Sequence, residues 1–286
     1  MSAPDTVAQA LNHARRLGVD RLDAQLLLGH LLGGRSRTWL MAHDTDALPP
    51  GCFEAFDALL QRRLAHEPVA YLLGHKEFFG LPLQVGPGVL VPRPDTEVLV
   101  EWALDCLPDA RKGHEDHAEP PRRVLDLGTG SGAIALAIQS QRPQAQVTAV
   151  DASDVALAVA RANAQALQLP VRCLLGSWFE PVAGEVFDVI VSNPPYIAEG
   201  DPHLAALVHE PISALTAGPD GLSDLRHLVA QAHQHLAPGG WLLLEHGHDQ
   251  HAPVKALLEA TGFQQVSGRF DLGGHVRCTG GQTRPD

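Results

Sequence analysis

The chain has 286 residues, about twice the length of a typical domain, which favours two domains or one large domain with an appendage. Hydrophobic residues make up 45% of it and no apolar run reaches ten residues, which excludes a membrane-spanning helix and a low-complexity chain. The formal net charge is -12 and most of the acidic excess follows residue 100, a balance that disfavours nucleic acid as the main ligand.

Residues 1–75 are predicted to form a small helical domain. Apolar residues recur at a spacing of three to four from Val7 to Leu17, and Asp20 is a suitable N-cap for a second helix that ends near Leu32. Two more helices are expected around residues 36–43 and between the Pro49-Pro50 pair and Pro68. Helices of this length with short links are typical of a compact bundle.

Residues 76–92 are predicted to be a β-hairpin that links this bundle to the rest of the chain. Short β-prone runs alternate there with Gly and Pro, as they do in hairpins. A helix is expected at 95–107, followed by an exposed loop rich in Pro and charge that reaches residue 123.

Residues 93–286 are predicted to be the larger domain, of the α/β class. From residue 122 onward strands and helices alternate, with two short strands expected near 263–267 and 275–278. This rhythm predicts a doubly wound, mostly parallel Rossmann-like sheet with helices on both faces. Because ligands of such sheets bind at the carboxyl ends of the strands, we expect the chemistry in the loops after Asp126, Val150 and Ser192.

The glycine-rich loop from Asp126 to Gly132 indicates a nucleotide-type cofactor. Its three glycines at alternate positions allow a tight turn and a close backbone approach to a ligand. Asp151, at the end of the next strand, could accept hydrogen bonds from both ribose hydroxyls of an adenosine. The loop also fits the looser dinucleotide pattern, so it does not choose between a nicotinamide cofactor and S-adenosylmethionine. Asp126 itself suits a cofactor with an ammonium group.

The sequence Asn193-Pro194-Pro195-Tyr196, after the fourth strand, is predicted to hold a planar group that carries NH₂. Two prolines fix the backbone, Asn193 offers an acceptor oxygen, and Tyr196 offers a flat ring. Oxygens of Asn193 and of the Pro194 backbone could each accept one N–H, which aims the nitrogen lone pair at an electrophile. A site built for NH₂ rejects ligands that lack it, because its acceptors would stay unpaired.

Together the two loops resemble those of class I S-adenosylmethionine-dependent methyltransferases that act on amino groups. Seven motifs along the chain narrow the match: VLVPRPDTEVLVE (89–101), DLGTGSGAIALA (126–137), AVD (149–151), SNPPYI (192–197), HEP (209–211), LLLEHG (242–247) and DLGGHVR (271–277). They resemble the release factor glutamine methyltransferases, the PrmC/HemK family, over nearly the whole chain. A sister family that acts on a ribosomal protein has a different linker and lacks the last motif. This chain departs from the family pattern at Val276 and at 278–280.

The resemblance implies a reaction: transfer of a methyl group from S-adenosylmethionine to the glutamine amide nitrogen of the GGQ motif in class 1 peptide release factors. Trp178 would pack beside the adenine, and Asn193 would touch both cofactor and substrate. The cofactor-binding residues expected in all are Asp126, Gly128, Thr129, Gly130, Ser131, Gly132, Asp151, Trp178 and Asn193. The catalytic, substrate-binding residues expected are Asn193, Pro194, Pro195 and Tyr196, with Arg93 and Glu97 along the roof of the site.

Three other functions compete with this one. An adenine-N6 nucleic-acid methyltransferase would share the Asn-Pro-Pro-Tyr chemistry, but the chain is acidic and has no Lys/Arg-rich recognition segment. A nicotinamide-dependent dehydrogenase would give that loop no role. A non-catalytic adaptor would use only the helical domain for docking.

The remaining features predict a monomeric cytoplasmic protein without metal. The N-terminus lacks the apolar segment of a secretion signal, and the four cysteines are scattered singly, as free thiols are. The sixteen histidines include the pair His114 and His117, which lies in the charged linker, and the cluster His246, His248 and His251, which would need a third-ligand geometry on a strand-to-helix turn; we expect no metal at either. The C-terminal Gly280-Gly281-Gln282 repeats the GGQ tripeptide; we interpret it as a coincidence in a disordered tail, with self-methylation of Gln282 as the alternative.

Overall fold

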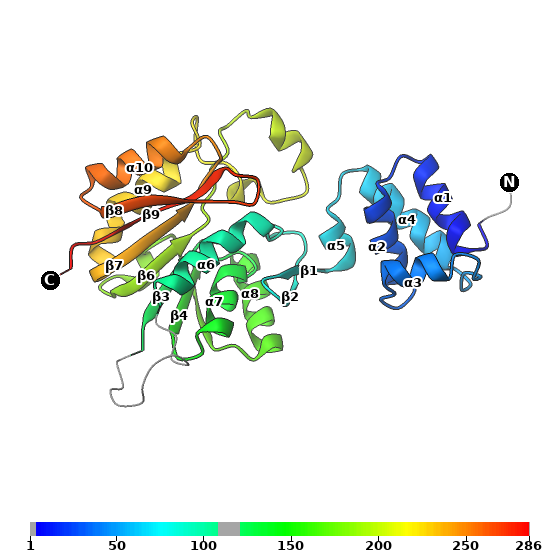
Figure 1. Cartoon of the computed structure of the whole chain (residues 1–286), viewed down its shortest axis with the longest axis horizontal. Coiled ribbons are helices and arrows are strands. Elements are labelled where there is room, and N and C mark those ends of the chain that lie inside the picture. The colour runs from blue at the N-terminus through cyan, green and yellow to red at the C-terminus, as the bar shows by residue number, and fades with distance from the viewer. Residues whose placement is uncertain (1–3, 108–120, 286) are drawn as a thin grey trace. The chain divides into compact units, whose positions relative to one another are not determined.

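The computed structural model describes residues 4–107 and 121–285 (Figure 1). The chain divides into two compact units: unit 1 is Met1–His75 with Ala206–His209, and unit 2 is Lys76–Ala205 with Glu210–Asp286. The linker and the larger domain that the sequence analysis separates at residue 92 fall in the same unit, so the predicted three-part division stays a prediction.

Unit 1 is a helical bundle, and its second helix begins at the predicted cap Asp20. Asp20 accepts a hydrogen bond from the backbone N–H of Leu22 at 2.7 Å, and Ser36 accepts one from that of Trp39 at 3.1 Å. Phe56 and Leu60 lie at the centre of the apolar core. The helices are α1 (Val7–Arg16), α2 (Arg21–Leu31), α3 (Arg37–Ala42), α4 (Cys52–Leu64) and α5 (Val69–Leu73).

The sequence analysis did not predict helix α5. It has five residues, begins directly after Pro68 and ends at Gly74, whose φ of 76° stops the helix. One and a half turns are too short to show a helical period in the sequence. Its burial of Ala70 and Leu72 stabilises it instead.

The predicted hairpin is present as β1 (His75–Phe78) and β2 (Leu81–Gln84). Phe79 and Gly80 both have positive φ, 51° and 78°, which is the backbone of a two-residue hairpin turn. Glu97 accepts a hydrogen bond from the backbone N–H of Phe79. Asn163, buried on helix α8 (Asp154–Leu167), donates to the carbonyls of Gln84 and Ser131 at 3.0 and 2.9 Å. One amide thus fixes the hairpin to the glycine-rich loop.

The predicted helix at 95–107 is a short 3₁₀ turn, η1 (Pro94–Thr96), that runs into α6 (Glu97–Asp105). Most of the predicted exposed loop, with His114 and His117, lies outside the described residues.

The predicted sheet is confirmed: seven strands in the order β5-β4-β3-β6-β7-β9-β8. The strands β3 to β7 run parallel, whereas β9 is antiparallel to both of its neighbours. The strands are β3 (Arg123–Leu127), β4 (Gln146–Asp151), β5 (Val171–Leu175), β6 (Phe187–Ser192), β7 (Leu236–Glu245), β8 (Gln264–Phe270) and β9 (Val276–Gln282). The remaining long helices are α7 (Ala133–Gln141), α9 (Ser223–Ala232) and α10 (His251–Ala260).

Both faces of this sheet are buried under helices, as a doubly wound fold requires (Figure 1). Along β3, Val124 belongs to the apolar cluster that includes α6 and α7, while Leu125 belongs to the cluster that includes α9 and α10. Leu243 and Leu244 divide in the same way along β7. Successive side chains point to opposite faces of a strand, so these runs of consecutive apolar residues feed two cores.

The predicted disordered tail is wrong, because residues 280–282 belong to strand β9, between β7 and β8. Gly280 and Gly281 are buried, and the Gln282 side chain donates to the carbonyl of Gly239 at 2.8 Å. A Cβ atom at Gly280 would lie 2.6 Å from a methyl carbon of Leu243. Glycine is present here for close packing, which a Gly-rich sequence alone does not distinguish from disorder.

Candidate active site

The glycine-rich loop and the Asn-Pro-Pro-Tyr loop begin side by side. Leu127 at the end of β3 is paired with Ser192 at the end of β6, and the Ser192 hydroxyl donates to the Leu127 carbonyl at 2.7 Å. Gly128 and Asn193 therefore leave the sheet from neighbouring positions at its carboxyl edge. Both residues line one cavity of ≈ 460 Å³ in unit 2. The two loops thus face the same cavity.

The backbone of the glycine-rich loop is held by the neighbouring strand. The N–H groups of Gly128 and Thr129 donate to the carbonyl of Val150, at 2.9 and 3.0 Å. Gly130, with φ of 58°, would direct a Cβ atom into open space, and it lines the cavity together with Gly128. Gly132 instead packs against helix α8, so the third glycine serves the fold and not the cavity lining.

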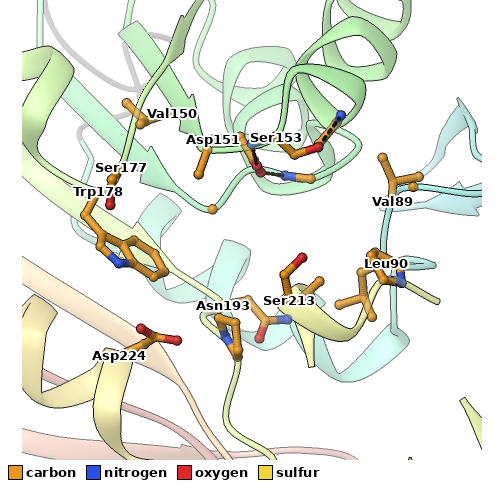
Figure 2. A pocket seen from close by; sticks show the side chains of 18 residues that line it. Val89, Leu90, Val150, Asp151, Ser153, Ser177, Trp178, Asn193, Ser213 and Asp224 are labelled. Atoms are coloured by element: carbon orange, nitrogen blue, oxygen red, sulfur yellow. Dashed lines mark hydrogen bonds between the residues drawn. The ribbon is translucent and has the colours of Figure 1, made fainter. Parts of the chain in front are cut away.

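Asp151 lines the cavity and has ordered backbone partners (Figure 2). One carboxylate oxygen accepts from the N–H of Gly130 and the other from the N–H of Ser153, both at 2.8 Å. Ser153 is the N-cap of α8 and accepts from the Ala156 N–H. Each carboxylate oxygen can accept two hydrogen bonds and each has one here, so Asp151 keeps acceptor capacity toward the cavity.

Asp126 does not line the cavity, although the sequence analysis placed it near a bound ammonium group. It is fully buried beneath the loop, where it accepts hydrogen bonds from the Thr129 hydroxyl at 2.6 Å and the Ala135 N–H at 3.2 Å. Within the described ranges its Oδ1 has no hydrogen-bond partner. Burial raises the pKa of Asp126 to about 7, and the charge of Asp151 adds to the increase. Thr129 and Ser131 are buried with it and are not lining residues either.

Trp178 forms one wall of the cavity, with its indole directed inward (Figure 2). Its φ of 46° is in the left-handed region, which costs a bulky residue on the order of 1–2 kcal/mol. The ring lies 3.5 Å from where a Cβ of Gly128 would be. A strained aromatic residue held against the glycine-rich loop is typical of a ligand site.

Of the Asn-Pro-Pro-Tyr loop, Asn193 and Pro195 line the cavity, and Figure 2 shows the Asn193 side chain across the cavity from Asp151. The Asn193 amide donates to the Thr96 hydroxyl at 3.2 Å. Tyr196 is not a lining residue: its hydroxyl lies 3.5 Å from an oxygen of Glu245, and burial, followed by the charge of Glu245, raises the pKa of Tyr196. Pro194 also lies outside the lining.

Arg93 and Glu97 do not line the cavity, although the sequence analysis expected them along the roof of the site. Arg93 forms an ion pair with Glu210 at 2.5 Å, and Glu210 also accepts from the N–H of Val91. Glu97 binds the hairpin turn through the Phe79 N–H. Arg93 therefore acts through Glu210, which holds the backbone at Val91, whereas Glu97 holds the hairpin turn directly.

Sequence reasoning missed more than half of the cavity lining. Residues 88–90 were assigned to a linker, although Val89 and Leu90 stand within a quoted motif. Asp224, in the first turn of α9, had no signal in the sequence; burial raises its pKa. The lining residues missed are Gly88, Val89, Leu90, Val150, Ala152, Ser153, Ala156, Ser177, Pro211, Ser213, Ala214 and Asp224.

The histidine cluster expected to be free of metal is bound internally. His246 and His251 both hydrogen-bond to the Thr279 hydroxyl, at 2.7 and 2.8 Å. Burial lowers the pKa of His246 to about 4. The described residues hold no group of three possible metal ligands, and no described helix is long and apolar enough to cross a bilayer.

Sequence comparison identifies the protein family to which the chain belongs. Over 267 residues the chain is 51% identical to the release factor glutamine methyltransferase of Bordetella pertussis, which covers 92% of this chain and 95% of that protein. The chain belongs to the release factor glutamine methyltransferase family. A second member of the family, from Pseudomonas aeruginosa, is 49% identical and covers 92% of each chain.

Family models agree with this membership, and a solved structure has the same fold. The model of the PrmC N-terminal domain matches residues 5–74, and that of the methyltransferase small domain matches residues 114–269. A crystal structure of a methyltransferase from Pyrococcus furiosus matches with a TM-score of 0.54 and 21% identity, over 80% of this chain and 99% of that one. This likeness confirms the predicted α/β fold.

Proposed function

We propose that this chain transfers a methyl group from S-adenosylmethionine to the side-chain amide nitrogen of the GGQ glutamine in class 1 peptide release factors. One observation carries the proposal: the glycine-rich loop and Asn193 open onto the same cavity. A cofactor at the first and an amide at the second would meet there. Membership of the family supports the choice of glutamine as substrate.

The cavity fits the cofactor in size and chemistry. It offers an indole face at Trp178, a carboxylate at Asp151 and open space above Gly130, which suit an adenine ring, a ribose diol and a close backbone approach. We propose that these residues, with Gly128, hold S-adenosylmethionine. Once bound, it supplies a methyl group already activated on a sulfonium.

The protein's own residues do the positioning. Asn193 Oδ1 and the Pro194 carbonyl would each accept one N–H of the substrate amide, which raises electron density on the nitrogen and fixes its direction. Alignment of bound reactants lowers a barrier by roughly 7–11 kcal/mol, so we assign no base to deprotonate the amide first. The proton leaves to water after transfer.

We further propose that unit 1 docks the release factor, and that the protein acts as a monomer in the cytoplasm without stable binding to nucleic acid. The acidic net charge of -12 supports a protein partner over a phosphate backbone.

Mass spectrometry of a purified release factor, treated with this protein and S-adenosylmethionine, tests the proposal. We expect one added methyl group on the GGQ glutamine, and transfer slower by about 10²-fold or more when Asn193→Ala replaces the wild type. An unmodified glutamine under conditions in which the protein binds S-adenosylmethionine would contradict the proposal. Methylation of adenine in duplex DNA offered in parallel would favour the nucleic-acid alternative.

A further inference from the structure

Two short segments that lie far apart in the sequence form one side of the cavity. The first precedes η1, and the second directly follows Glu210. Figure 2 shows Leu90 of the first segment and Ser213 of the second across the cavity from Trp178. Neither segment belongs to an α-helix or a strand, so its position depends on individual bonds. The loop wall, as we call this side, consists of Gly88, Val89, Leu90, Pro211, Ser213 and Ala214.

The Glu210 carboxylate connects the two segments of the loop wall. One of its oxygens accepts from the backbone N–H of Val91 at 2.9 Å, and the other accepts from the Arg93 guanidinium at 2.5 Å. Val91 directly follows the first segment, and Glu210 directly precedes the second. Only 2% of the Glu210 side-chain surface is exposed, so water does not readily replace either donor.

Backbone hydrogen bonds fix the far end of the second segment to the reactive loop. The Ile197 N–H donates to the Leu215 carbonyl at 2.9 Å, and the Ala217 N–H donates to the Ile197 carbonyl at 3.1 Å. Ile197 directly follows Tyr196. Removal of the Glu210 carboxylate would therefore release one end of this segment and leave its attachment to the Asn-Pro-Pro-Tyr loop in place.

We propose that Glu210 is a positioning residue that holds the loop wall closed against a bound cofactor and so slows the release of S-adenosylmethionine before methyl transfer. The inference rests on the proposed function. A ligand that fills the cavity lies between Trp178 and the loop wall. Without Glu210 the two segments can separate while the Trp178 side stays in place, which makes dissociation faster. Association does not need a closed wall, so its rate should change little.

The same inference gives a role to two motifs that the proposed reaction does not use. Arg93 stands in the motif at 89–101 and Glu210 in the motif at 209–211, yet neither residue lines the cavity. Because Glu210 is bonded to Arg93 and to the backbone at Val91, both motifs act on the cavity through the position of the loop wall.

Glu210→Ala, Arg93→Ala and the double variant test the proposal. S-adenosylhomocysteine is the probe, since it has no methyl group to transfer. Stopped-flow tryptophan fluorescence, to which Trp178 contributes, measures its association and dissociation rates with the full chain. Urea unfolding measures the stability of each variant, and transfer to a GGQ peptide measures the activity of the wild type.

Glu185→Ala is the matched control. This carboxylate also forms an ion pair, with Arg172 at 3.0 Å, but it precedes β6 and therefore lies at the edge of the sheet opposite the cavity. Its loss should lower the free energy of unfolding without a change in either rate. Lower stability alone is thus distinguished from a role at the loop wall.

We expect dissociation to be faster by about tenfold or more in Glu210→Ala, since loss of a buried charged partner acts mainly on dissociation. Arg93→Ala should show a smaller increase, because Val91 still donates to Glu210, and it keeps the test available if Glu210→Ala does not fold. The double variant should match Glu210→Ala within about twofold, since Arg93 acts through Glu210. Association rates should change by less than about threefold in all variants.

Unchanged dissociation in both single variants, with a wild type that methylates the GGQ peptide, would overturn the role of Glu210 and leave the proposed function intact. Slower association with unchanged dissociation would overturn it as well. A wild type that neither binds S-adenosylhomocysteine nor methylates the peptide would overturn both proposals.

Discussion

The buried carboxyl of Asp126 allows a quantitative prediction of how the free energy of unfolding depends on pH. Its pKa is raised from 3.8 to about 7, because Oδ1 lies in the protein interior without a hydrogen bond from the described residues. Between these values the folded protein keeps a proton that the unfolded chain has released, so the free energy of unfolding falls as pH rises. About three pKa units at 1.36 kcal/mol each give a loss of about 4 kcal/mol, complete above pH 7.

Asp126→Asn removes the titration and keeps the side-chain shape. We expect the free energy of unfolding of the variant, relative to that of the wild type, to increase by about 4 kcal/mol between pH 4 and pH 8. This change does not depend on the difference between the two proteins at pH 4. Urea unfolding followed by tryptophan fluorescence at several pH values measures this change. Glu101→Gln, at an exposed carboxylate of α6, is the control and should show no such trend. A constant difference between Asp126→Asn and the wild type across this range would refute the reasoning.

Three further predictions concern the site and its frame. Asn193→Ala should reduce methyl transfer by about 10²-fold or more, through loss of one positioned acceptor, while the Kd for S-adenosylmethionine measured by calorimetry changes only a few-fold. Gly130→Ala should strongly weaken the affinity for S-adenosylmethionine, because the residue has φ of 58° and its new methyl would enter the cavity. Gly262→Ala is the control, since its φ of 92° gives the backbone strain at a position outside the cavity. Gly280→Ala should lower the free energy of unfolding by about 1–3 kcal/mol, since its methyl would overlap Leu243, and an unchanged denaturation midpoint would contradict the close packing of β9.

The meeting of the two functional loops was predictable because parallel strands end at one edge of a sheet. Asp151 ends an apolar strand, Asn193 follows one, and Asp126 is the last residue but one of a third, so the strand pattern places all three near one edge of the sheet. The same pattern explains why Gly128 and Gly130 line the cavity as expected.

Side-chain direction was not predictable in this way. Asp126 turns beneath the loop toward Thr129, and Glu97 turns toward the hairpin; both choices depend on backbone N–H and hydroxyl groups whose positions exist only in the folded chain. Asp224 lines the cavity from α9, nearly a hundred residues after the glycine-rich loop, so no local motif predicts its position there. Long-range contacts of this kind are invisible to spacing arguments.

The tripeptide Gly280-Gly281-Gln282 has a consequence for self-recognition. Its backbone pairs with strands on both sides, and the Gln282 amide is occupied by Gly239 and Gln265. We therefore expect the folded protein not to methylate its own Gln282, because strand pairing and two side-chain hydrogen bonds hold the tripeptide in the sheet. A GGQ tripeptide can then be a substrate only when it lies in a loop that can enter the active site, and the sequence of the tripeptide alone does not decide this.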